Sequence, residues 1–311
     1  MNFGPTTAQQ KPLDTKNANL AKAIENVIAD STGETANIVG SRSTAGGCIN
    51  QTEVIDLSGG RKFFLKTNSL AADGLFEREA EGLQAIAAVD AINVPDVIGH
   101  GATSQTQFLV LQIIEPGPRQ SDFFQQFGRQ LASLHKHGVN ASQQFGFDRN
   151  NYLGSTSQPN DWSDSWLEFW RTQRLGFQFQ LARQNGLANS NFNNLADRLL
   201  KRLDDLIVVD EPPSLLHGDL WNGNFMRGRA GEPVLIDPAV YYGHREAEFG
   251  MTTLFGGFDE AFYSAYHETW PLQDGSDDRI EVYRLYHLLN HLNLFGSSYH
   301  AQCLEIMKKF A

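Results

Sequence analysis

Three polar side chains in the second half of the chain have the types and spacing that phosphoryl transfer requires. An apolar run enters His217-Gly218-Asp219, an asparagine follows at Asn224, and a second apolar run ends at Asp237. Phosphoryl transfer needs one carboxylate to orient the attacking hydroxyl and accept its proton, and further oxygen ligands to hold magnesium. The order and spacing match the H-x-D-x-x-x-x-N catalytic loop and the later metal-binding Asp of kinases. We therefore predict Asp219 as the base and Asn224 and Asp237 as the Mg²⁺ ligands.

Each piece of this pattern also has an ordinary explanation, because a lone His-x-Asp is usually a loop with a capping Asp. A lysine and a glutamate in the first half of the chain favour the chemical interpretation. Lys66 is a single cation at the end of an apolar strand, and Glu79 lies on the helix predicted over 73–89. Such a pair positions the ATP phosphates in kinases. Glu77 and Glu81 are rival carboxylates, and a surface lysine with a solvated glutamate is the alternative.

Two backbone segments are candidates for nucleotide contacts. Gly46 and Gly47 lie in a predicted hairpin, where amides can approach phosphate oxygens without a Cβ in the way, although Gly-Gly also simply makes turns. Residues 113–118 resemble a connector, because Pro lacks a donor and Gly bends freely. Here the main chain near Gln112 and Ile114 would hydrogen-bond to adenine, unless the segment is an ordinary interdomain linker.

Two differently built parts of the chain must position these residues. Residues 1–16 are predicted to form a flexible arm, 17–112 a nucleotide-binding lobe, 113–118 a hinge, and 119–311 a mainly helical lobe with the catalytic loop, metal and substrate site. The fold class is therefore α+β and two-lobed, with a five-stranded antiparallel sheet in the first lobe. The predicted strands are 36–42, 49–57, 62–66, 97–100 and 108–112. The predicted helices are 20–30, 73–89, 122–137, 166–184, 192–207, 247–254, 259–268 and 277–295.

Bulk composition excludes several classes of protein. The 311 residues are 41% hydrophobic and 20% charged, which is typical of a globular protein. The net charge of -11 disfavours binding to nucleic acid or to an anionic membrane. Two cysteines cannot build a disulfide framework or a Cys-rich zinc site, and no signal peptide or spanning segment is found, so a cytoplasmic location is expected. His135 and His137, at the end of a helix, are expected to be solvated rather than to bind metal.

Several motifs resemble the fructosamine kinase (ketosamine-3-kinase) family, over about residues 19 to 310. The His-x-Asp core is also shared with aminoglycoside and choline kinases, whereas the tryptophan after it, the Tyr-Gly-x-Arg-Glu loop and the Asn-His-Leu-Asn helix are more specific. The segments that carry the resemblance are 151–154, 158–160 with Trp162, 217–224, 236–239, 242–246, 254–258 and 288–296.

This resemblance implies a protein-kinase-like fold and ATP-dependent phosphorylation of the sugar 3-hydroxyl of a ketosamine, the rearranged adduct of a reducing sugar with an amine. The product then decomposes and frees the amine, so the reaction repairs proteins or metabolites. Gly46 and Gly47 would cover the phosphates. Trp221 is expected to stack on the sugar, and Asn290 and His291 to reach its hydroxyls from the last predicted helix. An ordinary packed helix with a polar edge is the alternative for these last two.

The sequence departs from the family pattern at two positions. Glu248 stands where many members have Asp, so a longer carboxylate must brace the catalytic loop if the Asp normally does so. His244 is Asp in many relatives. Cys48, in the predicted phosphate-covering hairpin, is linked in relatives to a redox-dependent homodimer, although it equally suits a turn that needs a small residue.

Two rival functions remain at this point. The first is another small-molecule kinase of the same fold, acting on an aminoglycoside, choline or homoserine. The second is a pseudoenzyme that binds nucleotide or a partner without turnover. Intact Lys66, Asp219, Asn224 and Asp237 argue against the second.

Overall fold

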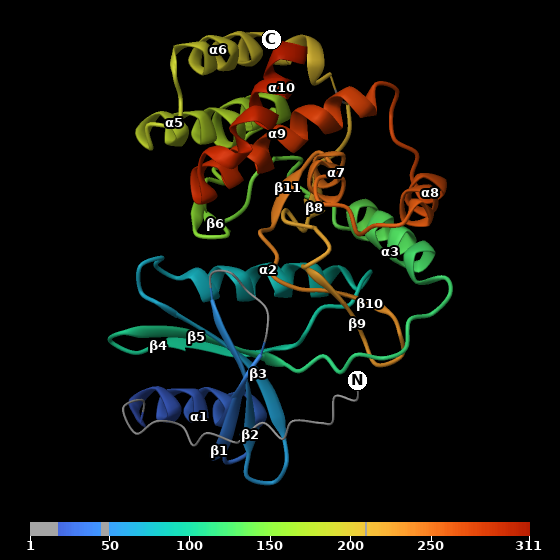
Figure 1. Ribbon diagram of the computed structural model, residues 1–311. Helices are drawn as coiled ribbons and strands as arrows, with labels where there is room; N and C mark the ends of the chain where they lie inside the picture. The colour runs from blue at the N-terminus through green and yellow to red at the C-terminus, as the bar shows by residue number, and fades with distance from the viewer. Residues whose placement is uncertain (1–17, 45–49, 209) are drawn as a thin grey trace, which may run out of the picture. The chain divides into compact units, whose positions relative to one another are not determined.

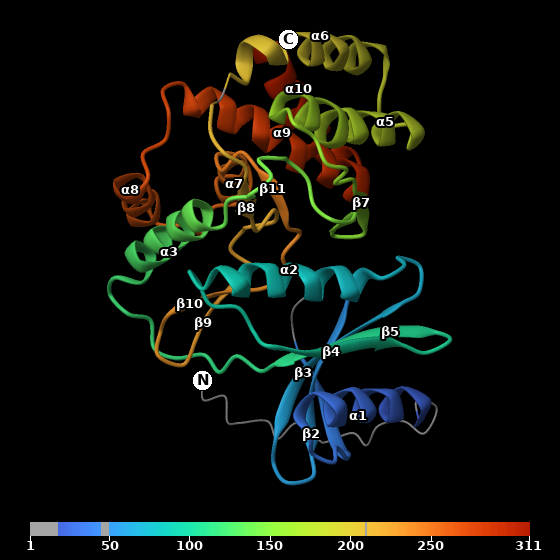
Figure 2. The same cartoon turned by 180° about the vertical axis from the view of Figure 1, so that it is seen from behind.

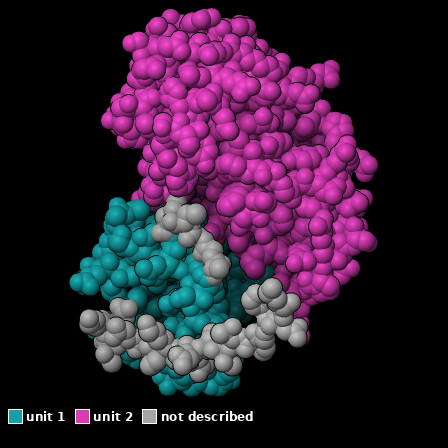
Figure 3. Space-filling model, in the orientation of Figure 1, with its two compact units in different colours: residues 1–84, 95–115 teal, residues 85–94, 116–311 magenta. Residues whose placement is uncertain are grey.

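The computed structural model describes residues 18–44, 50–208 and 210–311 (Figure 1). The predicted arm over 1–16, Gly46, Gly47 and Cys48 lie outside these residues. The chain divides into two compact units, residues 1–84 with 95–115 and residues 85–94 with 116–311 (Figure 3). Among the described residues, no helix is long and apolar enough to cross a membrane.

Unit 1 contains the predicted five-stranded antiparallel sheet, in the order β1-β2-β3-β5-β4. Gly59 and Gly60 adopt positive φ values of 95° and 87° in the turn before β3, which explains the two glycines there. Helix α1 (Ala18–Thr32) places Ile24 and Ile28 in a core with apolar residues of the strands. The strands are β1 (Ile38–Ser43), β2 (Gln51–Leu57), β3 (Lys62–Ser69), β4 (Val97–Ala102) and β5 (Thr106–Gln112).

Unit 2 is mainly helical, as predicted, with two differences. The segment predicted as one helix over 166–184 contains a π-helical stretch, Trp170–Gly176, and the last helix, α10, was not predicted. Helix α2 (Leu75–Val89) begins in unit 1 and ends in unit 2. The other helices are α3 (Phe123–His137), α4 (Trp166–Phe169), α5 (Phe177–Gln184), α6 (Ser190–Leu206), α7 (Ala247–Thr252), α8 (Glu260–Thr269), α9 (Ser276–Phe295) and α10 (His300–Phe310).

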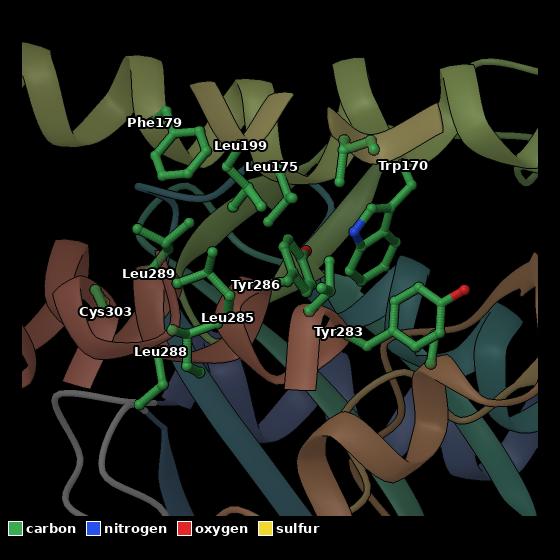
Figure 4. Close-up of a cluster of buried hydrophobic side chains, with 14 of the residues drawn as sticks. Trp170, Leu175, Phe179, Leu199, Tyr283, Leu285, Tyr286, Leu288, Leu289 and Cys303 are labelled. Atoms are coloured by element: carbon green, nitrogen blue, oxygen red, sulfur yellow. The ribbon is translucent and has the colours of Figure 1, made fainter. Parts of the chain in front are cut away.

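Two contact regions hold the helices of unit 2 together. Helices α3 and α8 lie side by side in both views (Figures 1 and 2), and Gly128 permits this approach because a Cβ there would lie 2.1 Å from the Phe262 carbonyl oxygen. A second cluster joins α9 to the π-helical stretch, α5, α6 and α10 (Figure 4), with Trp170, Tyr283 and Tyr286 in edge-to-face contact. Cys303 is fully buried in this cluster.

Short two-stranded sheets, which the sequence did not predict, carry the loops of unit 2. Strand β8 pairs with β11, β9 with β10, and β6 with β7, all antiparallel. These pairs place the segments after β8 and after β10 next to each other, where the predicted catalytic residues lie. Their bounds are β6 (Asn151–Leu153), β7 (Thr156–Gln158), β8 (Ser214–Leu216), β9 (Phe225–Arg227), β10 (Pro233–Leu235) and β11 (Tyr241–Gly243).

Candidate active site

The predicted ion pair between Lys66 and Glu79 is present in unit 1. Side chains alternate along a strand, so Leu65 enters the core shared with α1 while Lys66 points to the opposite face. Lys66 is 2% exposed, and its Nζ lies 2.7 Å and 2.9 Å from the two carboxylate oxygens of Glu79. The rivals Glu77 and Glu81 instead lie beside Arg78. The pairing is confirmed, and its role toward phosphates stays a prediction.

His217 joins the segments of Asp219 and Asp237, the predicted base and one of the predicted metal ligands, in unit 2. Its Nδ1 accepts a hydrogen bond from the Asp219 amide at 3.2 Å, so the proton resides on Nε2, which donates to the Ile236 carbonyl at 2.8 Å. Burial lowers the pKa of His217, which keeps the ring neutral and this tautomer in place. The ring thus ties the loop after β8 to the residue before Asp237.

The β9–β10 hairpin brings Asn224 beside the segment of Asp237. Asn224 directly precedes β9, and its carbonyl accepts a hydrogen bond from the Ile236 amide at 3.0 Å. Asp237 has a φ of 55°, a left-handed conformation that is rare for a residue with a side chain. Such strain persists only where the surroundings hold the backbone firmly, and it is concentrated at functional sites.

The carboxylate of Asp219 lies in the same cluster. Asn224 Nδ2 donates to the Asp219 main-chain oxygen at 2.8 Å and to its Oδ2 at 3.0 Å. Burial raises the pKa of Asp219 well above its ordinary value, and the negative charges of Asp237 and Glu248 raise it further, against the Asn224 hydrogen bond. The structure therefore brings Asp219, Asn224 and Asp237 together and surrounds Asp219 with groups that favour its taking up a proton.

Glu248 braces the catalytic loop from α7. It is 1% exposed, and its carboxylate accepts hydrogen bonds from the amides of His217 at 2.6 Å and Gly218 at 3.1 Å. Burial alone would raise the pKa of Glu248, but hydrogen bonding to His135 and to the His217 amide holds it below the ordinary value. The longer carboxylate at this position therefore braces the loop through two main-chain amides.

His135 was expected to be solvated, and this prediction is wrong. Its side chain is fully buried, with Nε2 3.5 Å from Glu248 and Nδ1 2.8 Å from the hydroxyl of Tyr266. Burial lowers the pKa of His135, so the ring is neutral. The polar residues at the end of α3 suggested a solvated surface, but α8 covers this face of α3. His137, two residues on, is exposed.

The loop 242–246 has a structural function that its motif did not reveal. Arg245 forms two hydrogen bonds of 2.8 Å with Glu211, and Glu246 pairs with Arg279 on α9. Hydrogen bonds to His244 and Arg245 overcome the effect of burial and hold the pKa of Glu211 at about 2. His244 also lies 2.9 Å from the hydroxyl of Tyr283. The partners of this loop are distant in sequence, so no local signal identified them.

The donor set fits magnesium. Asn224 Nδ2 faces the oxygens of Asp219, so its Oδ1 is directed away from them, and Asp237 adds a carboxylate. Magnesium prefers oxygen ligands and is usually held by one or two carboxylates together with substrate phosphates. In the described part of the chain, His, Cys, Asp and Glu side chains do not gather in threes to hold a metal. An ion here would thus need the Asn224 oxygen and the phosphates.

The predicted substrate residues occupy different environments. The Trp221 ring meets Phe255 edge-on at 6.2 Å, and Phe255 lies 4.9 Å from the ring of His291. The structure thus brings Trp221 and His291 into one aromatic row through Phe255, which the sequence analysis did not identify. Asn290 is 2% exposed, and its amide bonds to Gln178 and to the Leu153 carbonyl.

Of the residues predicted to contact the nucleotide through the glycines and the connector, only Gln112 and Ile114 lie within the described ranges. Gln112 ends β5, where its amide donates to the Asp96 carbonyl at 2.9 Å and its side chain accepts from the Asp96 amide at 3.2 Å. Within the described residues, no hydrogen bond involves the main chain of Ile114, which leaves this peptide available to a ligand. Nothing in the described residues bears on a dimer through Cys48.

Unit 2 also contains a cavity of about 490 Å³ beside β9. Aromatic side chains line it, and the guanidinium of Arg119 stacks on Phe124 at 4.8 Å. Met226, two residues after Asn224, forms part of the wall. Pro116, Phe123, Phe225, Arg227 and Gly257 complete the lining.

Sequence comparisons place the chain in a known family. The family model of fructosamine kinases matches residues 20–311. A probable ketoamine kinase from Synechocystis sp. is 42% identical, over 93% of this chain and 96% of its own. A chloroplastic protein-ribulosamine 3-kinase from Oryza sativa subsp. indica is 41% identical, over 89% of this chain and 80% of its own.

Structural comparisons agree with the sequence comparisons. A crystal structure of a protein assigned as a fructosamine-3-kinase, from Haemophilus somnus 129PT, has a TM-score of 0.84 at 30% identity, covering 92% of this chain and 96% of that chain. An aminoglycoside phosphotransferase solved with ADP and hygromycin B has a TM-score of 0.62 at 15% identity, covering 93% and 99%, which shows the fold alone. The predicted α+β, protein-kinase-like fold is confirmed. The chain belongs to the fructosamine kinase family and is an ATP-dependent phosphotransferase.

Proposed function

We propose that this enzyme uses ATP to phosphorylate the sugar 3-hydroxyl of a ketosamine, with ribulosamine and fructosamine adducts as the substrates to test first. Membership of the fructosamine kinase family supports this substrate class, as do relatives named ketoamine kinase and protein-ribulosamine 3-kinase. The observation that carries the mechanism is the cluster in which Asn224 bonds to Asp219 beside the segment of Asp237.

Asp219 accepts the proton of the attacking hydroxyl. The groups that raise its pKa make it a better proton acceptor than an exposed carboxylate, and Glu248 holds the loop that carries it. Asn224 and Asp237 hold the metal, and bound Mg²⁺ would neutralise negative charge on the phosphates. Lys66, oriented by Glu79, binds phosphate oxygens, and Gly46 and Gly47 cover them.

Nucleotide contacts are proposed on both sides of the connector. The main chain of Ile114 bonds to the adenine edge, and Gln112, which Asp96 holds in place, supports the end of the strand before it. In unit 2 the aromatic cavity beside β9 suits a planar base, and its two arginines suit an anionic ligand. Replacing Met226 by Ala should raise the KM for ATP more than the KM for the ketosamine.

The sugar is proposed to contact the aromatic row. Trp221, two residues after the base, stacks on the sugar face. His291 Nδ1 donates to the His287 carbonyl at 2.8 Å, so the neutral ring leaves Nε2 as an acceptor for a sugar hydroxyl. Asn290 is buried, and it is proposed to act by fixing the position of the helix that carries both residues.

The boundaries of the lobes, the cellular location and the oligomeric state are also proposed. We propose that 17–112 is the nucleotide-binding lobe, 113–118 the hinge and 119–311 the catalytic lobe, and that the enzyme acts in the cytoplasm. An oxidised dimer through Cys48 stays a prediction. A non-reducing gel of the wild type and of Cys48→Ala tests it, since a dimer that persists in the variant rules it out.

The decisive experiment is a substrate panel with ATP, read by mass spectrometry. Ribulosamine, erythrulosamine and fructosamine adducts are compared with an aminoglycoside and choline, and Asp219→Asn serves as the inactive control. A ketosamine should gain the mass of one phosphate and later lose its sugar. Phosphorylation of the aminoglycoside or choline alone, or nucleotide binding without phosphorylation of any ketosamine, would contradict the proposal.

A further inference from the structure

The β6–β7 hairpin and the residues after it place three amide side chains inside unit 2. Asn151, Gln158 and Asn160 are between 0% and 4% exposed, although all three are polar. Buried amides need hydrogen-bonding partners, and the identity of those partners indicates what the hairpin does.

Two of these amides bond to the main chain directly after the proposed metal ligand. Gln158 Nε2 donates to the Ala239 carbonyl at 3.0 Å, and Asn151 Nδ2 donates to the Val240 carbonyl at 2.7 Å. The two carbonyls lie two and three residues after Asp237. The hairpin therefore fixes the backbone that leads away from this residue.

The Ala239 peptide is also where the metal-binding segment meets the catalytic loop. Its amide donates to the His217 carbonyl at 2.8 Å. Its carbonyl lies so close to Gly218 that a Cβ on this glycine would come within 2.1 Å of the oxygen. Gln158 thus bonds to the peptide that sets the distance between the two segments.

The direction of these hydrogen bonds is determined by Arg174. A guanidinium can only donate, so the Asn160 atom 2.7 Å from Arg174 Nη2 is Oδ1, and the Asn160 nitrogen must donate to Asn151 Oδ1, at 3.0 Å. Asn151 Nδ2 is then left to donate to Val240. The hydroxyl of Tyr286 donates to Gln158 Oε1 at 2.8 Å and orients that amide in the same way.

Burying the charged guanidinium of Arg174 costs free energy because the group loses its contact with water. It is fully buried in the π-helical stretch, and among the described residues no carboxylate lies within ion-pair distance of it. Aromatic rings cover it instead, with Tyr241 4.0 Å and Phe169 4.5 Å from its central carbon. The buried guanidinium donates into a chain of amides and polarises each hydrogen bond in turn. This strengthens the hydrogen bond from Asn151 to the Val240 carbonyl.

We propose that Gln158 and Asn151, supported by Asn160 and Arg174, are positioning residues that hold Asp237 in its left-handed conformation. They thereby set the affinity of the enzyme for a divalent cation with nucleotide. This inference rests on the proposed function, in which Asp237 is a metal ligand. Groups that orient metal ligands typically contribute 10- to 100-fold to metal affinity.

The test measures metal binding directly, without turnover. Mn²⁺ binding in the presence of ADP is measured by electron paramagnetic resonance for the wild type and Gln158→Met, which keeps the side-chain length but loses both donors. We expect about tenfold weaker Mn²⁺ binding. Hydrogen exchange of residues 236–241 in the metal-free protein should also become faster, because the Ala239 amide loses its fixed geometry.

Gln178→Met is the matched control. Gln178 is equally buried in the same unit but bonds to Asn290 and Asn293, and not to the segment after Asp237. Its replacement should leave Mn²⁺ affinity within about twofold of wild type. Equal losses in Gln158→Met and Gln178→Met would show that the hairpin amides only support general packing, and would overturn the proposal.

Two further variants separate the possible failures. If Asp237→Asn abolishes Mn²⁺ binding while Gln158→Met leaves it unchanged, the inference falls and the proposed function stands. If Asp237→Asn binds Mn²⁺ as the wild type does, Asp237 is not a ligand, and both the inference and the proposed function are contradicted. Should Gln158→Met not fold, Tyr286→Phe removes only the hydroxyl that orients Gln158 and should weaken Mn²⁺ binding about threefold. An unchanged affinity in that variant overturns the inference.

Discussion

The Lys66–Glu79 pair of unit 1 and the Asp219 cluster of unit 2 are positioned in different ways. Lys66 and Glu79 lie on a regular strand and a regular helix, and an ion pair joins them. Asp219 and Asp237 lie in loops, and side chains from distant segments, including Glu248, support those loops. A regular element positions a side chain through its own repeating backbone geometry, whereas a loop needs buried hydrogen bonds from other segments to reach the same precision.

The largest effect is expected at the base itself. Asp219→Asn should lower kcat by about 10²- to 10⁴-fold, because the attacking hydroxyl loses its proton acceptor. Nucleotide affinity, measured by calorimetry, should remain within a few-fold of wild type, since Lys66 and the connector are untouched. Near-normal turnover would show that another group is the base.

Lys66→Met should cost both activity and stability. Loss of a phosphate-binding cation should lower kcat/KM by about 10²-fold. The free energy of unfolding, from urea denaturation, should fall by about 3–5 kcal/mol because the carboxylate of Glu79, whose side chain is only 10% exposed, loses the cation it pairs with. The double variant Lys66→Met/Glu79→Leu should recover much of the stability but none of the activity. Recovery of both would contradict a role in catalysis.

Glu248→Gln tests whether the loop depends on its charged brace. One amide oxygen cannot replace the two carboxylate oxygens that accept from His217 and Gly218, so kcat should fall about tenfold, or ~1.4 kcal/mol of transition-state stabilisation. Glu246→Gln, which breaks the buried pair with Arg279, is the control. It should lower the Tm without changing kcat more than about twofold. Equal losses of kcat in Glu248→Gln and Glu246→Gln would show that the loop does not depend specifically on its brace by Glu248.

The free energy of unfolding is also expected to depend on pH through a buried histidine of unit 2. His287 is 3% exposed, and burial, then the charges of His291 and Arg174, lower its pKa to about 3. The unfolded chain binds this proton below pH ~6.5, so stability falls as pH is lowered from there toward 3. His287→Leu should reduce this slope by about 1.4 kcal/mol per pH unit between pH 6 and 4 in urea titrations. An unchanged slope in His287→Leu would contradict the prediction.

The contrast between the units also explains what sequence reasoning could recover. Alternation along β3 and helical spacing identified the sheet and most helices, because these features depend on near neighbours. The partner of Lys66 was predicted from the strand lysine and helix glutamate pair of kinases, and not from local spacing. The spacing of its motif predicted the catalytic loop, whose role stays a prediction. The roles of His135, Gln158 and Arg174 could not be found, because each depends on a partner more than ten residues away that only tertiary structure supplies.

The fully buried thiol of Cys303 has a practical consequence. Burial raises its pKa to about 12, so almost none of it is the reactive thiolate at neutral pH. The sequence has only one other cysteine, Cys48. A thiol reagent that labels the folded wild-type enzyme once per chain therefore reports on Cys48 alone.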